Sequence, residues 1–97
     1  MKNEIQQKQS ENKGMFYIEK DGDIVAELTY TLLDNNVMTL DHTKTEPEET
    51  GQGLAGKLVE HSVKYARENN FKIDPLCEYA AHQFEKHEEY QEVQATE

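Results

Sequence analysis

The clearest pattern in the chain is an alternation of apolar and polar positions over residues 24–32. Successive side chains of a β-strand point to opposite faces of a sheet, so this segment predicts a strand with one buried face. Segments 15–19 and 37–43 are shorter and contain aromatic and β-branched residues, and polar turns at 21–23 and 34–36 separate them from the central one. Because such short turns join antiparallel neighbours, the three segments predict a three-stranded antiparallel meander.

The period of the apolar positions changes after the meander. Over residues 54–68 they recur three and four positions apart, which predicts an amphipathic helix that Asn69-Asn70 can end. A fourth strand is predicted from Phe71. Pro75 lacks a backbone N–H group, so this strand should lie at a sheet edge or carry a bulge. Residues 78–86 predict a second, shorter helix.

This order of elements predicts a single α/β (α+β) domain at residues 15–94. The 97 residues, of which 35% are hydrophobic, allow one thin core and no second domain. Residues 1–14 are polar and show no periodicity, so we expect them to form a disordered N-terminal tail.

The charge of the chain narrows the range of partners. A formal net charge of −10 disfavours nucleic-acid binding, which requires a basic patch, and binding to anionic membranes. No segment approaches the roughly 18 consecutive apolar residues of a membrane-spanning helix. An acidic surface attracts cations, so the expected partner is a small-molecule amine or a basic peptide, although the same charge can serve solubility alone. The oligomeric state is left open.

Other absences predict the compartment and the metal content. Residues 1–13 contain no apolar segment of the kind found in secretory signals, so we expect a cytoplasmic protein. Cys77 is the single cysteine of the sequence, which excludes an internal disulfide and a cysteine-based structural zinc site. The four histidines do not show metal-ligand spacing, so we expect no metal.

Residues 51–56, GQGLAG, form a glycine-rich loop at the start of the first predicted helix. Glycines let the backbone approach a phosphate, and a helix N-terminus presents unpaired N–H groups to it. The spacing fits three patterns at once: the dinucleotide-binding GxGxxG with Asp74 as a ribose ligand, the first part of a P-loop, and a loop that binds acetyl-CoA.

The surroundings of the loop argue against two of these patterns. A P-loop needs Ser or Thr after its lysine to hold Mg²⁺, and here Leu58 follows Lys57. A dinucleotide loop directly follows a strand of a parallel βαβ unit, whereas here an acidic loop at 44–50 follows an antiparallel meander. A glycine-rich helix start without any ligand remains as an alternative.

Residues 16–93 resemble the compact, stand-alone members of the GNAT superfamily of N-acetyltransferases. The matching segments are Asp41-His42-Thr43, the loop 51–58, and Pro75-Leu76-Cys77-Glu78-Tyr79-Ala80 followed by His87-Glu88-Glu89-Tyr90. The resemblance implies a mixed sheet with helices on both sides and acetyl-CoA lying along the third predicted strand. One position departs from the superfamily, because Thr50 stands where Arg or Gln is usual.

The resemblance also implies the residues that bind the cofactor. The pyrophosphate of acetyl-CoA would meet the backbone N–H groups of the loop. The implied cofactor-binding residues are Thr43, Gly51, Gln52, Gly53, Leu54, Ala55, Gly56 and Lys57.

Two residues are candidates for the chemistry. The resemblance places Cys77 near the thiol of CoA, where its thiolate could accept the acetyl group; alternatively, the amine attacks the thioester directly while another group takes its proton. His42 is the candidate general base, since the unperturbed pKa of imidazole is about 6.5. Structural roles stand beside both: a small buried apolar residue for Cys77, and a strand-end histidine bonded to backbone for His42.

The resulting function is an acetyl-CoA-dependent N-acetyltransferase that acts on an unidentified amine. The alternative is a module that binds CoA or acetyl-CoA without acceptor chemistry. Acetyl transfer to any amine separates the two.

Overall fold

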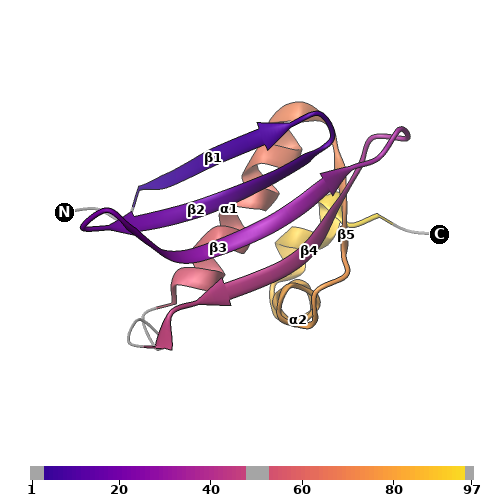
Figure 1. Ribbon diagram of the computed structural model, residues 1–97. Helices are drawn as coiled ribbons and strands as arrows, with labels where there is room; N and C mark the ends of the chain where they lie inside the picture. The colour runs from indigo at the N-terminus through magenta and orange to yellow at the C-terminus, as the bar shows by residue number, and fades with distance from the viewer. Residues whose placement is uncertain (1–3, 48–52, 96–97) are drawn as a thin grey trace.

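A computed structural model describes residues 4–47 and 53–95 of the chain. The elements in chain order are β1 (Ile5–Ser10), β2 (Lys13–Lys20), β3 (Asp23–Leu32), β4 (Val37–Thr45), α1 (Leu54–Asn69), β5 (Lys72–Pro75), α2 (Glu78–Lys86) and the 3-10 helix η2 (Glu88–Val93). The strands form one sheet in sequence order, in which β1 to β4 are antiparallel neighbours and β5 runs parallel to β4 (Figure 1). The predicted mixed α+β fold is confirmed.

The N-terminal strand corrects the sequence prediction. The predicted disordered tail at residues 1–14 is wrong over the described residues 4–14, because β1 pairs along its whole length with β2. The meander therefore has four antiparallel strands instead of three. The ring of Tyr30 lies over Gly14, where an added Cβ would come within 2.3 Å of it. Its hydroxyl accepts a hydrogen bond from Gln7 Nε2 at 2.6 Å and donates one to Gln9 Oε1 at 2.8 Å. A polar network thus fixes a strand that has little apolar surface of its own.

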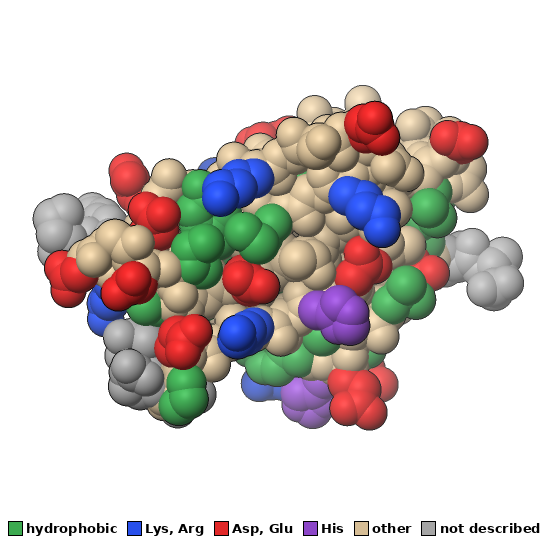
Figure 2. Space-filling view, in the orientation of Figure 1, with side chains coloured by type: hydrophobic (Ala, Val, Ile, Leu, Met, Phe, Trp, Pro, Cys, Tyr) green, Lys and Arg blue, Asp and Glu red, His purple; other side chains and the backbone are tan. Residues whose placement is uncertain are grey.

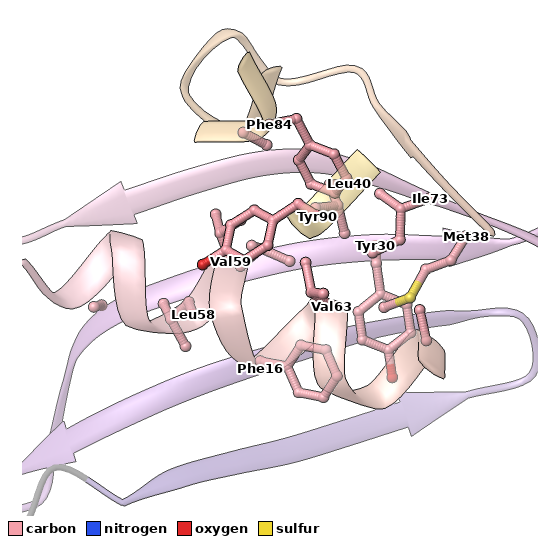
Figure 3. Close-up of a cluster of buried hydrophobic side chains, with 14 of the residues drawn as sticks. Phe16, Tyr30, Met38, Leu40, Leu58, Val59, Val63, Ile73, Phe84 and Tyr90 are labelled. Carbon is pink, nitrogen blue, oxygen red and sulfur yellow. The ribbon is translucent and has the colours of Figure 1, made fainter. Parts of the chain in front are cut away.

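One face of the sheet is covered and forms the hydrophobic core. Figure 3 shows the side chains of this cluster gathered between the sheet and the helices. The sheet contributes Phe16, Ile18, Leu28, Tyr30, Met38, Leu40 and Ile73, and the helices contribute Leu58, Val59, Val63, Phe84 and Tyr90. Burial of these side chains is the main favourable term in folding.

Both helices pack on this same face, which corrects the expectation of helices on both sides. The ring of Phe84, from α2, lies 5.5 Å from that of Tyr90, from η2. Arg67, from α1, donates a hydrogen bond to the carbonyl oxygen of Glu89 at 2.8 Å, which ties η2 to α1. A Cβ on Gly56 would lie 3.2 Å from Tyr79 Oη, so the first turns of α1 and α2 approach closely.

The other face of the sheet is open in the described part of the chain. Alternation along β3 and β4 directs Thr29, Thr31 and Thr39 to this side. Figure 2 shows acidic, basic and histidine side chains among small hydrophobic groups on it. No helix of the described residues is long and apolar enough to cross a bilayer.

Candidate functional site

The candidate site lies where β4 and β5 part. The two strands pair between Val37–Leu40 and Lys72–Pro75, and the backbone N–H groups of Leu76 and Cys77 then both bond to the Leu40 carbonyl, at 3.1 and 2.9 Å. The chain turns into α2 there, while β4 continues to Thr45. Within the described chain, the outer edge of β4 beyond Leu40 therefore has no strand beside it. β5 is an edge strand, as Pro75 predicted.

Cys77 occupies the mouth of this gap. It is the N-cap residue of α2, and its Sγ lies 3.5 Å from the hydroxyl oxygen of Thr43 on β4. Burial raises the pKa of the thiol, but hydrogen bonds to sulfur from the backbone of Ala80 and from the Thr43 hydroxyl stabilise the thiolate. Further backbone bonds from Tyr79 and Thr43 act in the same direction, and the pKa of Cys77 lies below its ordinary value.

The first turn of α1 lies near this position. Gly53 is the N-cap with φ of 74°, a left-handed conformation that favours glycine, and it explains why the loop carries glycine there. Lys57 N–H donates to the Gly53 carbonyl at 3.0 Å, so the N–H groups of Leu54, Ala55 and Gly56 precede the first intrahelical bond. No side chain of the described residues caps this end, and its first turn contains no acidic residue. The arrangement suits an anion.

The remaining predicted loop residues cannot be placed. Gly51 and Gln52 lie outside the described residues, and so does Thr50, the position that differs from the superfamily. Of the predicted cofactor site, the structure brings Thr43 beside Cys77, and it brings the α1 turn at Gly56 against the α2 turn at Tyr79.

His42 lies on the other side of the sheet from Cys77. A register shift between β3 and β4 inserts Asp41 as an extra residue, so that Leu28 pairs with Thr43 and Thr29 with His42. Thr43 consequently points to the covered side and His42 to the open side, where it is exposed. The two candidate catalytic residues therefore do not form a pair, but flank the gap from opposite faces.

The open side carries a shallow cavity that sequence reasoning missed. It has a volume of ≈630 Å³ and is lined by Lys13, Gly14, Thr29, Tyr30, Asp41, His42 and Leu76. The hydroxyls of Thr31 and Thr39 each donate a hydrogen bond of 2.8 Å to the carboxylate of Asp41. The break in alternation at Asp41-His42, two polar residues after a buried Leu40, was the signal in the sequence.

Over residues 4–47 and 53–95, no three His, Cys, Asp or Glu side chains lie close enough together to share a metal ion.

Comparison with known proteins gives matches in both sequence and structure. The solution structure of a GCN5-like candidate N-acetyltransferase from Staphylococcus aureus is 44% identical, with a TM-score of 0.73, and the match covers 100% of this chain and 93% of that one. A ribosomal-protein-alanine N-acetyltransferase from Brucella melitensis is 17% identical with a TM-score of 0.65, covering 91% of this chain and 65% of that one. A search of curated protein sequences found no significant match.

One further structure contains a ligand. A candidate streptothricin acetyltransferase from Bacillus anthracis, crystallised with acetyl coenzyme A, is 16% identical with a TM-score of 0.61, and the match covers 79% of this chain and 46% of that one. At this identity the likeness concerns the fold, and the chain spans about half the length of that enzyme.

The family itself follows from the sequence match. Residues 15–93 match the family described as GCN5-related N-acetyl-transferase, and this match covers most of the chain, from within β2 to the end of η2. The 44% identical relative, which the match covers almost completely, agrees with this family match. The chain belongs to the GCN5-related N-acetyltransferase family.

Proposed function

We propose that the chain transfers the acetyl group of acetyl-CoA to an amine at the gap between β4 and β5. The observation that carries the proposal is the parting of these strands after Leu40, which leaves the β4 edge free beside Cys77 and Thr43. The family match supports acetyl transfer to nitrogen as the reaction class.

The residues around the gap fit acetyl-CoA, which supplies an acetyl thioester already activated for transfer. The free backbone edge of β4 beyond Leu40 offers hydrogen bonds to an extended chain with amide groups, such as pantetheine. The uncapped N–H groups of Leu54, Ala55 and Gly56 suit its pyrophosphate. Lys57 adds a positive charge one residue further on. Gly51 and Gln52 are proposed to extend this anion site.

The chemistry has two routes, which differ in the role of Cys77. In the first, the Cys77 thiolate attacks the acetyl carbonyl, the bond from carbon to the CoA sulfur breaks, and the acceptor amine later takes the acetyl group from Cys77. In the second, the amine attacks acetyl-CoA directly, the CoA thiolate leaves, and His42 takes the proton that the amine loses. The lowered pKa of the Cys77 thiol favours the first route, and the exposed position of His42 on the open side suits the second.

The acceptor and the location extend this proposal. We take the acceptor to be a small-molecule amine or a basic peptide, in agreement with the net charge of −10. A cytoplasmic location is also proposed, because the first route needs Cys77 as a reduced thiol and thiols stay reduced in that compartment.

Two measurements test the function. In an NMR titration, acetyl-CoA should shift the amide resonances of Thr43, Cys77 and residues 53–58, whereas NAD and ATP should shift them far less. With a panel of primary amines, CoA release should then exceed the rate of spontaneous hydrolysis. Equal shifts with NAD would contradict the cofactor assignment. Binding without release on any amine would leave the alternative, a CoA-binding module.

A further inference from the structure

The cavity on the open side of the sheet borders the proposed site. Leu76, at its rim, directly follows β5 and precedes Cys77, so the cavity and the Cys77 thiol meet at the same gap from opposite faces. His42 lies in the cavity wall on the β4 side. A molecule seated in this cavity therefore has access to the gap.

Asp41 gives the cavity a fixed negative charge. The Thr31 hydroxyl donates to its Oδ2 and the Thr39 hydroxyl to its Oδ1, both at 2.8 Å, so the carboxylate is held in one orientation. A carboxylate has about four lone-pair sites, so these two bonds leave acceptor capacity free. In the described part of the chain, no Lys, Arg or His forms an ion pair with it. A half-buried carboxylate in this state binds a cation favourably.

The other walls set the shape of the ligand. The side chain of Leu76 is 62% exposed at the rim and offers an apolar contact between Asp41 and the gap. Lys13 lies on the β2 side of the cavity and repels a cation there, which directs a positive group towards β4. A volume of ≈630 Å³ accommodates a short alkyl chain with groups at both ends.

We propose that this cavity binds the acceptor, and that Asp41 holds an ammonium group of the acceptor that is not acetylated. The substrate class is then amines with a second positive charge, either free alkyl diamines or lysine-rich peptides. The net charge of −10 raises the local concentration of such dications. The inference rests on the proposed function, because the second amino group must reach an acetyl group at the gap.

The test is a pair of NMR titrations of the full chain with 1,4-diaminobutane and with 1-butylamine, which has the same chain length and one charge fewer. The diamine should shift the amides of Thr29, Thr31, Asp41 and His42 and bind about tenfold more tightly, the worth of one charge-assisted hydrogen bond. A peptide of two lysines forms a third arm, and tighter binding of this peptide than of the diamine would identify a peptide source. Equal affinity of diamine and butylamine, or shifts elsewhere, overturns the proposal.

Variants assign the effect to Asp41. Asp41→Asn should abolish the preference for the diamine, while Asp23→Asn, an equal charge change at the β2–β3 turn, should keep it. If Asp41→Asn does not fold, Leu76→Lys places an ammonium at the exposed rim and should weaken diamine binding about tenfold, whereas Leu76→Met should not. Full diamine affinity in Asp41→Asn or Leu76→Lys overturns the proposal.

An acetyl-CoA titration of the same samples separates this inference from the proposed function. Asp41→Asn should leave the acetyl-CoA shifts at Thr43 and Gly53 unchanged. Intact acetyl-CoA binding with no amine at the cavity overturns the inference alone. If the native chain does not bind acetyl-CoA, the proposed function is contradicted, whether or not amines bind in the cavity.

Discussion

The covered face and the open face of the sheet are made from the same strands but carry different kinds of residue. Along β3, Leu28 and Tyr30 point into the core, whereas Thr29 and Thr31, which alternate with them, point outward. On β4, the extra residue Asp41 brings two successive polar side chains to the open side. In so small a protein, alternate positions of one strand thus serve stability on one face and the proposed acceptor cavity on the other.

The largest expected effect decides which face carries the chemistry. Under the Cys77 route, acetyl-CoA should add one acetyl group to the protein, and Cys77→Ala should abolish the adduct and the transfer. Under direct transfer, Cys77→Ala stays active and His42→Ala loses about 10²–10⁴-fold in rate, the usual contribution of a general base. Intact-mass spectrometry and a CoA-release assay measure both. If neither variant changes the rate, both assignments fail.

The covered face should dominate the stability. Phe16 is fully buried, and Phe16→Ala should lower the free energy of unfolding by about 3–5 kcal/mol. Thr29→Ala, on the open face of the next strand, should change it by about 0.5 kcal/mol or less. Urea unfolding of the two variants gives the comparison, and similar losses for both would contradict it.

A smaller loss of stability is expected from a substitution at Gly14, where the core leaves no space for a side chain. Gly14→Ala places a Cβ within 2.3 Å of the Tyr30 ring, so the ring must move and about 1–3 kcal/mol of stability should be lost. Thermal unfolding measures the loss. An unchanged melting temperature would show that the ring has space to shift.

The contribution of β1 should be smaller again. Removal of residues 1–10 deprives the Tyr30 hydroxyl of its bonds to Gln7 and Gln9, which should cost about 1–2 kcal/mol. The same deletion in a Tyr30→Phe background should cost less, because the hydroxyl is already absent. Equal losses in the two backgrounds would show that the network does not stabilise β1.

The smallest expected effect is a pH dependence at the covered face. Burial, and then the charge of Lys64, lower the pKa of His61, which lies edge-on to Phe16 at 4.8 Å, while Glu68 opposes the shift. Below about pH 6.5 the histidine of the unfolded chain therefore takes up a proton more readily than His61 of the folded chain. The free energy of unfolding is consequently highest above that pH, and it decreases as the pH falls through the folded pKa. Denaturant unfolding at pH 7.5 and 5.5 should show a smaller difference in His61→Gln than in the native chain. The same difference in both would exclude His61 as the cause.

The elements with strong periodicity were predictable from the sequence. The prediction places α2 at residues 78–86, as the structure does, and Asn70 ends α1 with φ of 61°, as its tolerance of that conformation predicts. The strand β1 was missed because its residues are mostly Gln and Lys and its turn contains Glu11 at φ 56° instead of a glycine. Its pairing depends on Tyr30, which is distant in sequence.

The candidate site was predictable only in part, because some of its features depend on contacts between residues that are distant in sequence. The glycine loop and Cys77 stand out in the sequence, but the open-face cavity depends on the register shift at Asp41. The two successive polar residues after Leu40 signal a break in alternation, but they do not specify which residue is inserted. That His42 and Cys77 lie on opposite faces follows from this one inserted residue. Both helices cover the same face of the sheet because α2 packs against α1. This tertiary contact cannot be predicted from the local sequence of either helix.

The parallel pairing of β5 with β4 also bears on how the chain assembles. The strands β1 to β4 are joined by short turns and can pair locally, whereas Val37 meets Lys72 after the chain has passed through α1. Closing so long a loop costs entropy before any contact compensates it, so this pairing should form late in folding and open first in local unfolding. The gap beside Leu40 does not exist until that pairing is made. The meander can therefore be in place well before the molecule has a place to hold its substrates.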